Sequence, residues 1–380
     1  MNDLLNEMQI WRRDFHAHPE LGFNEKRTAS RVVELLESFG IEVHREVGRT
    51  GVVGVLQKGN GTWSIGLRAD MDALPIDELN EFDYASRNGG VMHACGHDGH
   101  TSMLLGAAKM LAQDGDFNGR AVFLFQPNEE HGEGALAMLA DDVFGRFGVD
   151  EVYAMQNIPG MEVGTFATRA GPVCASEALF EIEITAQGGH AALPHMGVDA
   201  IIVGAEVVGT LQTIVSRKLD PSLNGVVSIT EFETDGKRNV LPGRAVLRGD
   251  ARALTPEVNV KIEARLRQLV EGICFAHGVS ARVSYDTIFP AVINDSVVAN
   301  DAARAASGVG AVDGACEPKL FSEDFAHFAA AKPGCFMLMG NGVEGANARP
   351  LHSADYDFND GALASGAAFW VKLVEQQLAV

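Results

Sequence analysis

Residues 64–75 read SIGLRADMDALP, an apolar run followed directly by charged residues. Residues 64–67 form a largely apolar run with the length of a buried strand, and the charged residues Arg68, Asp70 and Asp72 follow directly. Similar short apolar runs lie at residues 51–56, 121–125 and 152–155, and helical spacing lies between two of them at 101–111. Strands that alternate with helices predict an α/β domain with a mostly parallel sheet.

The pattern changes near residue 176. Strands are predicted at residues 179–186, 226–232, 244–253 and 279–285, and helices at 199–215 and 256–277. The order β-α-β-β-α-β is typical of a ferredoxin-like split βαβ sandwich. Amphipathic helices are predicted at residues 2–18 and 23–39, and a last helix at 361–378. We therefore expect a discontinuous larger α/β domain, residues 1–175 with 289–380, and an inserted lid or dimerisation domain at 176–288.

Composition narrows the classes of partner. The chain has 380 residues and a formal net charge of −21, which disfavours nucleic acid and anionic membranes as partners. Five cysteines, an odd number in a long chain, argue against a disulfide framework. The first residues have no basic or apolar segment typical of a secretory signal, and no long apolar run predicts a membrane span. We expect a cytoplasmic protein.

The densest group of potential metal ligands lies at residues 93–100, which read HACGHDGH. Thiolate and imidazole are the ligands that a borderline-soft divalent ion prefers. Cys95 and His97 are two residues apart, so on an extended or looped backbone both side chains can reach one ion. His93 and His100 are expected to support the site, and Asp98 to orient an imidazole. The alternative is a loop in which Cys95 is a small buried hydrophobe.

A second acidic segment follows the apolar run at 121–125. Residues 125–134 read FQPNEEHGEG, and the adjacent Glu129 and Glu130 point in different directions. One carboxylate can ligate a metal while the other acts as general base on a water. Taken alone, this segment could equally be a solvated acidic turn. The same holds for Asp70 and Asp72, and a lone histidine such as His352 is more often structural than a ligand.

Together these segments resemble one family, the co-catalytic zinc or manganese metallopeptidases that include aminoacylases, carboxypeptidase G and succinyl-diaminopimelate desuccinylase. Within it they are most similar to the hippurate hydrolase and auxin-conjugate amidohydrolase branch. The matching segments span almost the whole chain and lie at residues 68–75, 93–101, 125–134, 188–190, 239–242, 321–325 and 351–360. The resemblance implies the same fold as the periodicity, with an inserted small domain.

The resemblance also implies roles for individual residues. It implies that Glu129 is the general base, which takes a proton from water and passes it to the leaving nitrogen. Asp72 is expected to hold a ligand or tune that base. The implied metal ligands are Cys95, His97, Glu130 and His352.

Two residues of the inserted domain are also implied in function. His190 is expected to reach a neighbouring active site across a homodimer and to stabilise the tetrahedral oxyanion. Asn239 is expected to contact substrate through its side-chain amide.

One position departs from the family. Residues 154–160 read AMQNIPG, and Gln156 stands where the branch has a histidine ligand. An amide oxygen is a weaker donor to zinc than imidazole, so one of two metal sites should be weakened. The site then holds one ion, or favours manganese, or the chemistry has shifted to another C–N bond. Asn128 and His131 stand where the branch usually has alanine and glycine, and we expect His131 to be exposed.

These features predict a metal-dependent amidohydrolase that cleaves the amide C–N bond of a small N-acyl-amino-acid-like substrate. The expected cofactor is manganese or zinc, one or two per chain, and the expected assembly is a homodimer. One alternative is hydrolysis of another C–N bond, by aryl amine deamination or decarbamoylation. The other is a non-catalytic binding protein on the same fold, in which Glu129, His190 and Asp72 should have been lost; all three are present.

Overall fold

The computed structural model describes residues 2–380, which form two compact units. The first unit comprises the chain up to Val173 together with Ile293–Glu317 and Asp324–Val380, and the second comprises Cys174–Val292 and Pro318–Glu323. The short segment 318–323 was expected in the larger domain. It belongs to the second unit because the backbone N–H of Ala175 donates to the carbonyl oxygens of Lys319 and Phe321.

The first unit is built on one eight-stranded sheet with the order β1-β2-β4-β3-β5-β16-β6-β15. The central strand β3 pairs in parallel with β4 and β5, and β5 pairs in parallel with β16. The pairs β1–β2, β2–β4 and β16–β6 are antiparallel. The strands are β1 Glu42–Val47, β2 Gly51–Lys58, β3 Ser64–Asp70, β4 Gly119–Gln126, β5 Glu151–Pro159, β6 Thr165–Ala167, β15 Ala311–Asp313 and β16 Gly334–Gly342.

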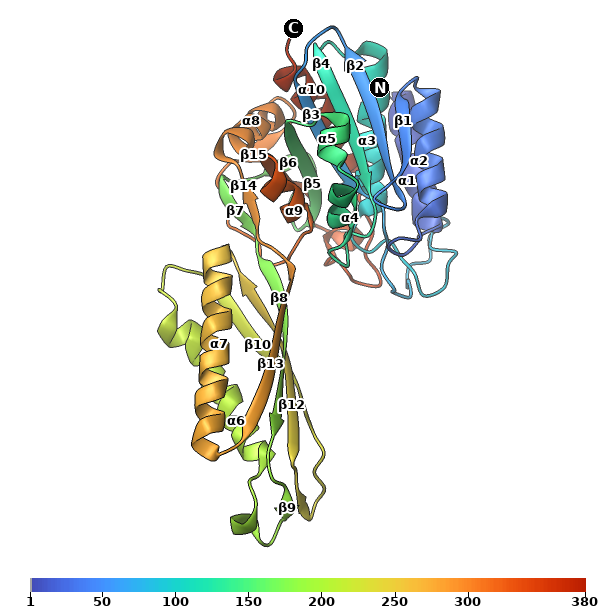
Figure 1. The fold of residues 1–380 in the computed structure, drawn as a ribbon. Coiled ribbons are helices and arrows are strands. Elements are labelled where there is room, and N and C mark those ends of the chain that lie inside the picture. The colour runs from blue at the N-terminus through green and yellow to red at the C-terminus, as the bar shows by residue number, and fades with distance from the viewer. Residues whose placement is uncertain (1) are drawn as a thin grey trace. The chain divides into compact units, whose positions relative to one another are not determined.

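Helices cover both faces of this sheet (Figure 1). Strand β16 shows the alternation that requires two layers: Cys335 and Met337 join the core beneath one set of helices, whereas Phe336 packs against Phe325 of α9. The first set is α1 Asn2–Ala17, α2 Lys26–Ser38, α3 His97–Asp114, α8 Ser296–Ser307 and α10 Leu363–Gln377. The second set is α4 Gly134–Ala140, α5 Val143–Phe147 and α9 Phe325–Ala331. The mostly parallel α/β prediction is confirmed.

The second unit is a four-stranded antiparallel sheet with two helices on one face. Its strands, in the order β10-β12-β8-β13, are β8 Ser176–Thr185, β10 Gly225–Thr234, β12 Arg244–Ala253 and β13 Ser280–Phe289. Its helices are α6 Ala200–Leu211 and α7 Pro256–His277. The chain order is therefore β-α-β-β-α-β, as the sequence predicts. Two small sheets pair β9 Gly189–His190 with β11 Val240–Leu241, and β7 Gly171–Cys174 with β14 Val292–Asn294.

The helix with the clearest terminal signals was predicted best. The structure places α7 at residues 256–277, as expected, because Thr255 accepts a hydrogen bond from Val258 N and Gly278 ends the helix at φ 65°. Helix α2 begins three residues later than predicted, at Lys26, because Phe23 has φ 60°. Within residues 2–380, none of the helices has the length and apolar character required to cross a membrane.

Candidate active site

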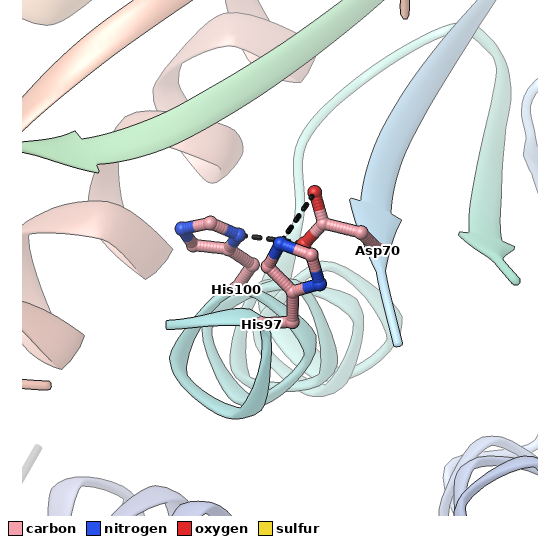
Figure 2. Close-up of side chains that lie close together, drawn as sticks. All are labelled: Asp70, His97 and His100. Carbon is pink, nitrogen blue, oxygen red and sulfur yellow. Dashed lines mark hydrogen bonds and ion pairs between the residues drawn. The ribbon is translucent and has the colours of Figure 1, made fainter. Parts of the chain in front are cut away.

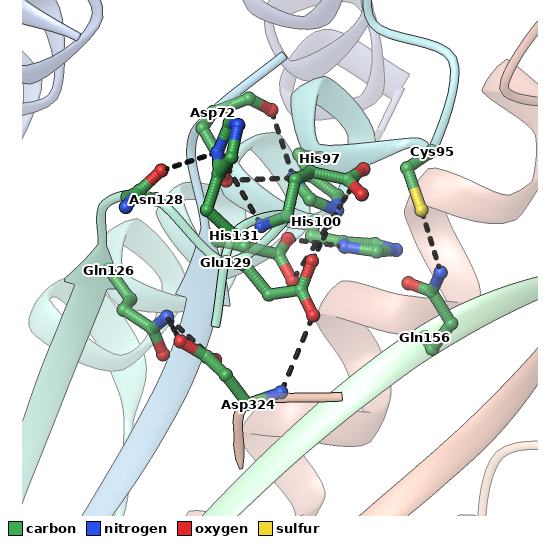
Figure 3. A network of polar contacts seen from close by, with 12 residues as sticks. Asp72, Cys95, His97, His100, Gln126, Asn128, Glu129, His131, Gln156 and Asp324 are labelled. Carbon is green, nitrogen blue, oxygen red and sulfur yellow. Dashed lines mark hydrogen bonds and ion pairs between the residues drawn. The ribbon is translucent and has the colours of Figure 1, made fainter. Parts of the chain in front are cut away.

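The predicted polar segments meet at the carboxyl ends of the parallel strands β3, β4 and β5. Asp72 follows β3, Glu129 follows β4, and Gln156 lies near the end of β5. Figure 3 shows these side chains directed toward one another, with Cys95 and His97 beside them. In open α/β sheets, ligands bind at this edge, where strand ends and helix starts present polar groups together.

The segment 93–100 is not wholly extended or looped, and that expectation is corrected. His97 is the first residue of α3, and Gly96 precedes it in the left-handed conformation, with φ 88°. A Cβ atom at Gly96 would lie 2.1 Å from the side-chain oxygen of Asn157, so glycine is required there. His97 and His100 are therefore three residues apart on one helix face, and Cys95 lies outside the helix.

Three of the four implied ligands form one group. The ligand atoms of Cys95, Glu130 and His352 all lie within 4.8 Å of one another, and His352 Nε2 is 3.4 Å from Glu130 Oε2. His97 belongs to an adjoining group with Glu129 and Glu130, and its Nε2 lies 3.8 Å from Glu130 Oε1. A thiol, two imidazoles and a carboxylate are a donor set suited to a divalent transition metal.

Hydrogen bonding around these groups fits a bound cation. His97 Nδ1 lies 2.9 Å from the backbone oxygen of Asp72, and a bond donated by this nitrogen would leave Nε2, which lies 3.8 Å from Glu130 Oε1, to ligate a cation. Among the described residues, buried Glu130 Oε1 has no hydrogen-bond donor. Buried acceptors without donors are uncommon, and a cation at this point would satisfy this oxygen.

Gln156, which the resemblance implies replaces a histidine ligand, contacts Cys95 of the same group. Its Nε2 donates to Cys95 Sγ at 3.2 Å, while its Oε1 is buried without a hydrogen-bond partner among the described residues. The amide therefore contacts the thiol as a donor in this arrangement. Its free oxygen is the atom that would have to replace the imidazole nitrogen as a ligand.

Glu129 and Asp72 flank the ligand group. Glu129 is 6% exposed, its Oε2 lies 4.0 Å from His97 Nε2, and its Oε1 accepts a hydrogen bond from Asp324 N at 3.4 Å. Asp72 Oδ2 accepts from Glu130 N at 3.1 Å, and its Oδ1 lies 3.3 Å from His97 Nδ1. Asp72 thus contacts two of the residues implied as ligands, and the Glu129 carboxylate lies beside one of them, His97.

A buried network that the sequence did not reveal supports these residues. His100 Nδ1 lies 2.6 Å from Asp70 Oδ1, and its Nε2 lies 2.8 Å from Asn157 Oδ1. Figure 2 shows the Asp70 carboxylate joined by dashed lines to both His97 and His100. Burial opposes the charged form, but His97, His100 and Arg68 together hold the pKa of Asp70 well below its usual range.

A second polar network holds the first turn of α3 in place through contacts with α1. Asp98 does orient an imidazole, but the imidazole is that of His16 in α1: His16 Nδ1 lies 2.9 Å from Asp98 Oδ2, and His16 Nε2 lies 3.0 Å from Glu78 Oε1. Arg12 Nη1 lies 3.5 Å from Asp98. Burial opposes the charge on His16, but the two carboxylates raise its pKa to about 9.

Three other predicted residues lie outside the ligand groups. His93 is buried, neither ring nitrogen has a hydrogen-bond partner among the described residues, and burial lowers its pKa to about 4. His190 and Asn239 belong to the second unit, where His190 pairs with Val240 across β9 and β11 and Asn239 O accepts from Ala191 N. Ala192 N donates to His190 Nδ1 at 3.0 Å, so the neutral ring carries its proton on Nε2.

Comparisons with known proteins place the chain in one family. The model of the peptidase family M20/M25/M40 matches residues 66–376. The chain is 38% identical to a hippurate hydrolase of Campylobacter jejuni over 99% of this chain and 98% of that protein. It is 42% identical to an N-acyl-L-amino acid amidohydrolase of Geobacillus stearothermophilus over 77% of this chain and 80% of that protein. A Bacillus subtilis crystal structure, described as a dinuclear metal-binding peptidase of the M20 family, matches with a TM-score of 0.87 and 31% identity over 100% of this chain and 99% of that one.

The raised pKa of His16 predicts a dependence of stability on pH. Because the pKa rises from 6.5 unfolded to about 9 folded, the charged ring stabilises the fold fully below pH 6.5, and this contribution is lost as the pH rises through about 9. We expect His16→Gln to unfold more easily than the wild type at pH 6, by up to about 3 kcal/mol, and the gap to narrow by pH 9.5. Denaturant unfolding of both proteins across this range measures the gap, and a gap independent of pH would contradict the assignment.

Proposed function

The chain belongs to peptidase family M20/M25/M40 and is a hydrolase, and on that premise we propose that it cleaves the amide C–N bond of a small N-acyl amino acid. The observation that carries this proposal is the position of Glu129 beside the group formed by Cys95, Glu130 and His352. A carboxylate next to a cation site is the arrangement needed to remove a proton from water and deliver it to a leaving amine.

The proton transfers are assigned to Glu129. Its carboxylate accepts a proton as the water oxygen forms a bond to the acyl carbon. The same carboxylic acid then donates this proton to the amide nitrogen as the C–N bond breaks, which gives a carboxylic acid and an amine. Asp72 keeps this arrangement in place, because it accepts from Glu130 N and contacts His97.

Cys95, Glu130, His352 and His97 are the residues that would hold the cation, and we propose manganese or zinc. Such an ion, when bound, polarises the substrate carbonyl and lowers the pKa of water. The amide oxygen of Gln156 is a weaker metal ligand than the imidazole it replaces. Its amide nitrogen already donates a hydrogen bond to Cys95 Sγ. We therefore propose that one cation per chain is held tightly and a second only weakly.

His190 is assigned the role of stabilising the oxyanion. Its Nδ1 accepts a backbone N–H, so its Nε2–H is the donor that can stabilise negative charge on the former carbonyl oxygen. We propose that the chain forms a homodimer, in which the second unit of one chain supplies His190 to the active site of the other. Asn239, which directly precedes β11 and accepts a backbone hydrogen bond from Ala191, is proposed to contact the substrate.

The alternative reaction is hydrolysis of another C–N bond, by deamination of an aryl amine or by decarbamoylation. Gln156 favours this alternative only because it changes the ligand set. A panel of N-acyl amino acids, aryl amines and N-carbamoyl compounds, assayed with metal-free protein supplemented with manganese, zinc or cobalt, separates the two. Turnover confined to N-acyl amino acids supports the proposal, and turnover confined to the other classes replaces it.

The general-base assignment predicts the effect of Glu129→Gln. The amide cannot accept a proton, so we expect kcat to fall by about 10³-fold or more, while the protein retains its metal because Glu129 is not a proposed ligand. Steady-state kinetics and elemental analysis of the same preparation measure the two quantities. Glu133→Gln, an exposed carboxylate of the same segment, is the matched control and should retain activity. Near-normal turnover by Glu129→Gln would refute the assignment.

The proposed weak second metal site predicts the effect of Gln156→His. The purified wild type should contain fewer than two tightly bound ions per chain, and Gln156→His should bring the content close to two because an imidazole nitrogen replaces the amide. Elemental analysis after mild chelation measures both. Two ions in the wild type that survive this chelation would contradict the weak second site.

The shared active site predicts complementation. His190→Ala and Glu129→Gln should each be nearly inactive, whereas mixed dimers contain one site with both an intact Glu129 and a His190 from the other chain. Random mixing should restore about a quarter of wild-type activity, because half of the dimers are mixed and each has one intact site. Differently tagged chains allow the mixed dimers to be purified, and these should show about half of wild-type activity because one of their two sites is intact. Mixed dimers without activity would exclude a shared site.

A further inference from the structure

The turn that carries Glu129 and Glu130 starts with an unusual backbone conformation. Strand β4 ends at Gln126, and two residues later Asn128 has φ 47°, in the left-handed region. Asn128 is also only 3% exposed. Asparagine tolerates this region better than most residues, but the conformation needs support from its surroundings. Asn128 sets the direction in which the chain leaves the strand, and therefore the direction of the two glutamates that follow.

The segment before α2 supports Asn128 from one side. Asn128 N donates to Glu25 Oε1 at 2.9 Å, and Thr50 Oγ1 donates to the other oxygen of the same carboxylate at 2.5 Å. Glu25 is fully buried. Gly22 packs directly against the Asn128 side chain, since a Cβ atom at Gly22 would lie 1.7 Å from Asn128 Oδ1. The backbone and the side chain of Asn128 are thus both fixed by a distant part of the sequence.

His131 supports Asn128 from the other side. His131 Nδ1 lies 2.9 Å from Asn128 Oδ1, and because the amide oxygen can only accept, the ring nitrogen donates. The ring is exposed, as the sequence predicts, but it is not without a role in the turn. This bond joins residues on either side of Glu129 and Glu130, and Figure 3 shows it near Glu129. The backbone bond from Gly132 N to Glu129 O, 2.8 Å long, lies within the same turn.

We propose that Asn128 and His131 are positioning residues for the reaction, and that their hydrogen bond holds Glu129 in the orientation needed for proton transfer. The proposal rests on the general-base function proposed for Glu129. Proton transfer requires hydrogen-bond distance between the base and the water, and a displacement of about 1 Å can lower a rate by about 10²-fold. A turn with a left-handed residue next to the base would lose that orientation easily without the cross-link.

The test removes each half of the bond separately. Asn128→Gly deletes the acceptor but tolerates the positive φ, so it adds no backbone strain, and Asn128→Asp keeps an oxygen acceptor at the same place. His131→Ala deletes the donor at an exposed position. Glu133→Ala, an exposed residue of the same segment that makes no part of the bond, is the control.

We expect Asn128→Gly and His131→Ala each to lower kcat, measured at saturating metal, by about 10-fold to 100-fold, with KM little changed. The double variant should lose no more than either single variant, because both remove one bond. Asn128→Asp should retain most of the activity. Full activity in either single variant, losses that multiply in the double variant, or an Asn128→Asp variant as impaired as Asn128→Gly would overturn the proposal.

Failure of the underlying function gives a different result. If the wild type hydrolyses no N-acyl amino acid, the general-base function fails, and the positioning effect is then measured through Glu130 in the same turn. Titration of metal-free protein with zinc should show weaker binding by Asn128→Gly and His131→Ala than by Asn128→Asp. Equal zinc affinities in all of these variants would overturn the positioning role as well.

Discussion

The site depends on the hydrogen bonds and ion pairs made by the buried guanidinium of Arg68. It lies in β3, donates to Gln126 of β4 at 2.8 Å and to Asp324, which precedes α9, at 2.9 Å. It therefore joins two parallel strands and the helix layer directly beneath the strand ends. Asp324 in turn donates its backbone N–H to Glu129, so the same interaction reaches the proposed base. Removal of one partner from such a buried ion pair typically costs about 3–5 kcal/mol.

Buried charge explains why so many polar contacts surround the site. Asp70, Asp72, Asp98 and Glu129 are nearly inaccessible to water, and buried carboxylates are costly unless they are paired. Arg68 compensates Asp70 and Asp324, whereas Arg12 and His16 compensate Asp98 on the α1 side. Glu130 is different, because one of its buried oxygens has no hydrogen-bond donor among the described residues. This oxygen therefore lies where a cation is expected.

Local sequence patterns predicted much of this structure. Contacts between residues far apart in the sequence determine the rest. Hydrophobic periodicity located the buried strands and α7, because burial alternates with a fixed period in each element. Clusters of metal-ligating residue types in the sequence identified Cys95, Glu129 and Glu130 as candidate site residues. Periodicity could not reveal that His97 begins a helix, since the determining contact is between Gly96 and Asn157, 61 residues apart. The pairing of His16 with Asp98 likewise depends on the packing of α1 against α3, which no local signal specifies.

In the proposed reaction, water, assisted by Glu129, attacks the acyl carbon of an N-acyl amino acid. Hydrolysis of N-benzoylglycine in ¹⁸O-labelled water, followed by mass spectrometry of both products, follows the oxygen of that water. One ¹⁸O atom should appear in the benzoic acid from each first turnover and none in the glycine, and Glu129→Gln should form neither product. Release of unlabelled benzoic acid, or equal product formation by Glu129→Gln, would contradict the proposed reaction.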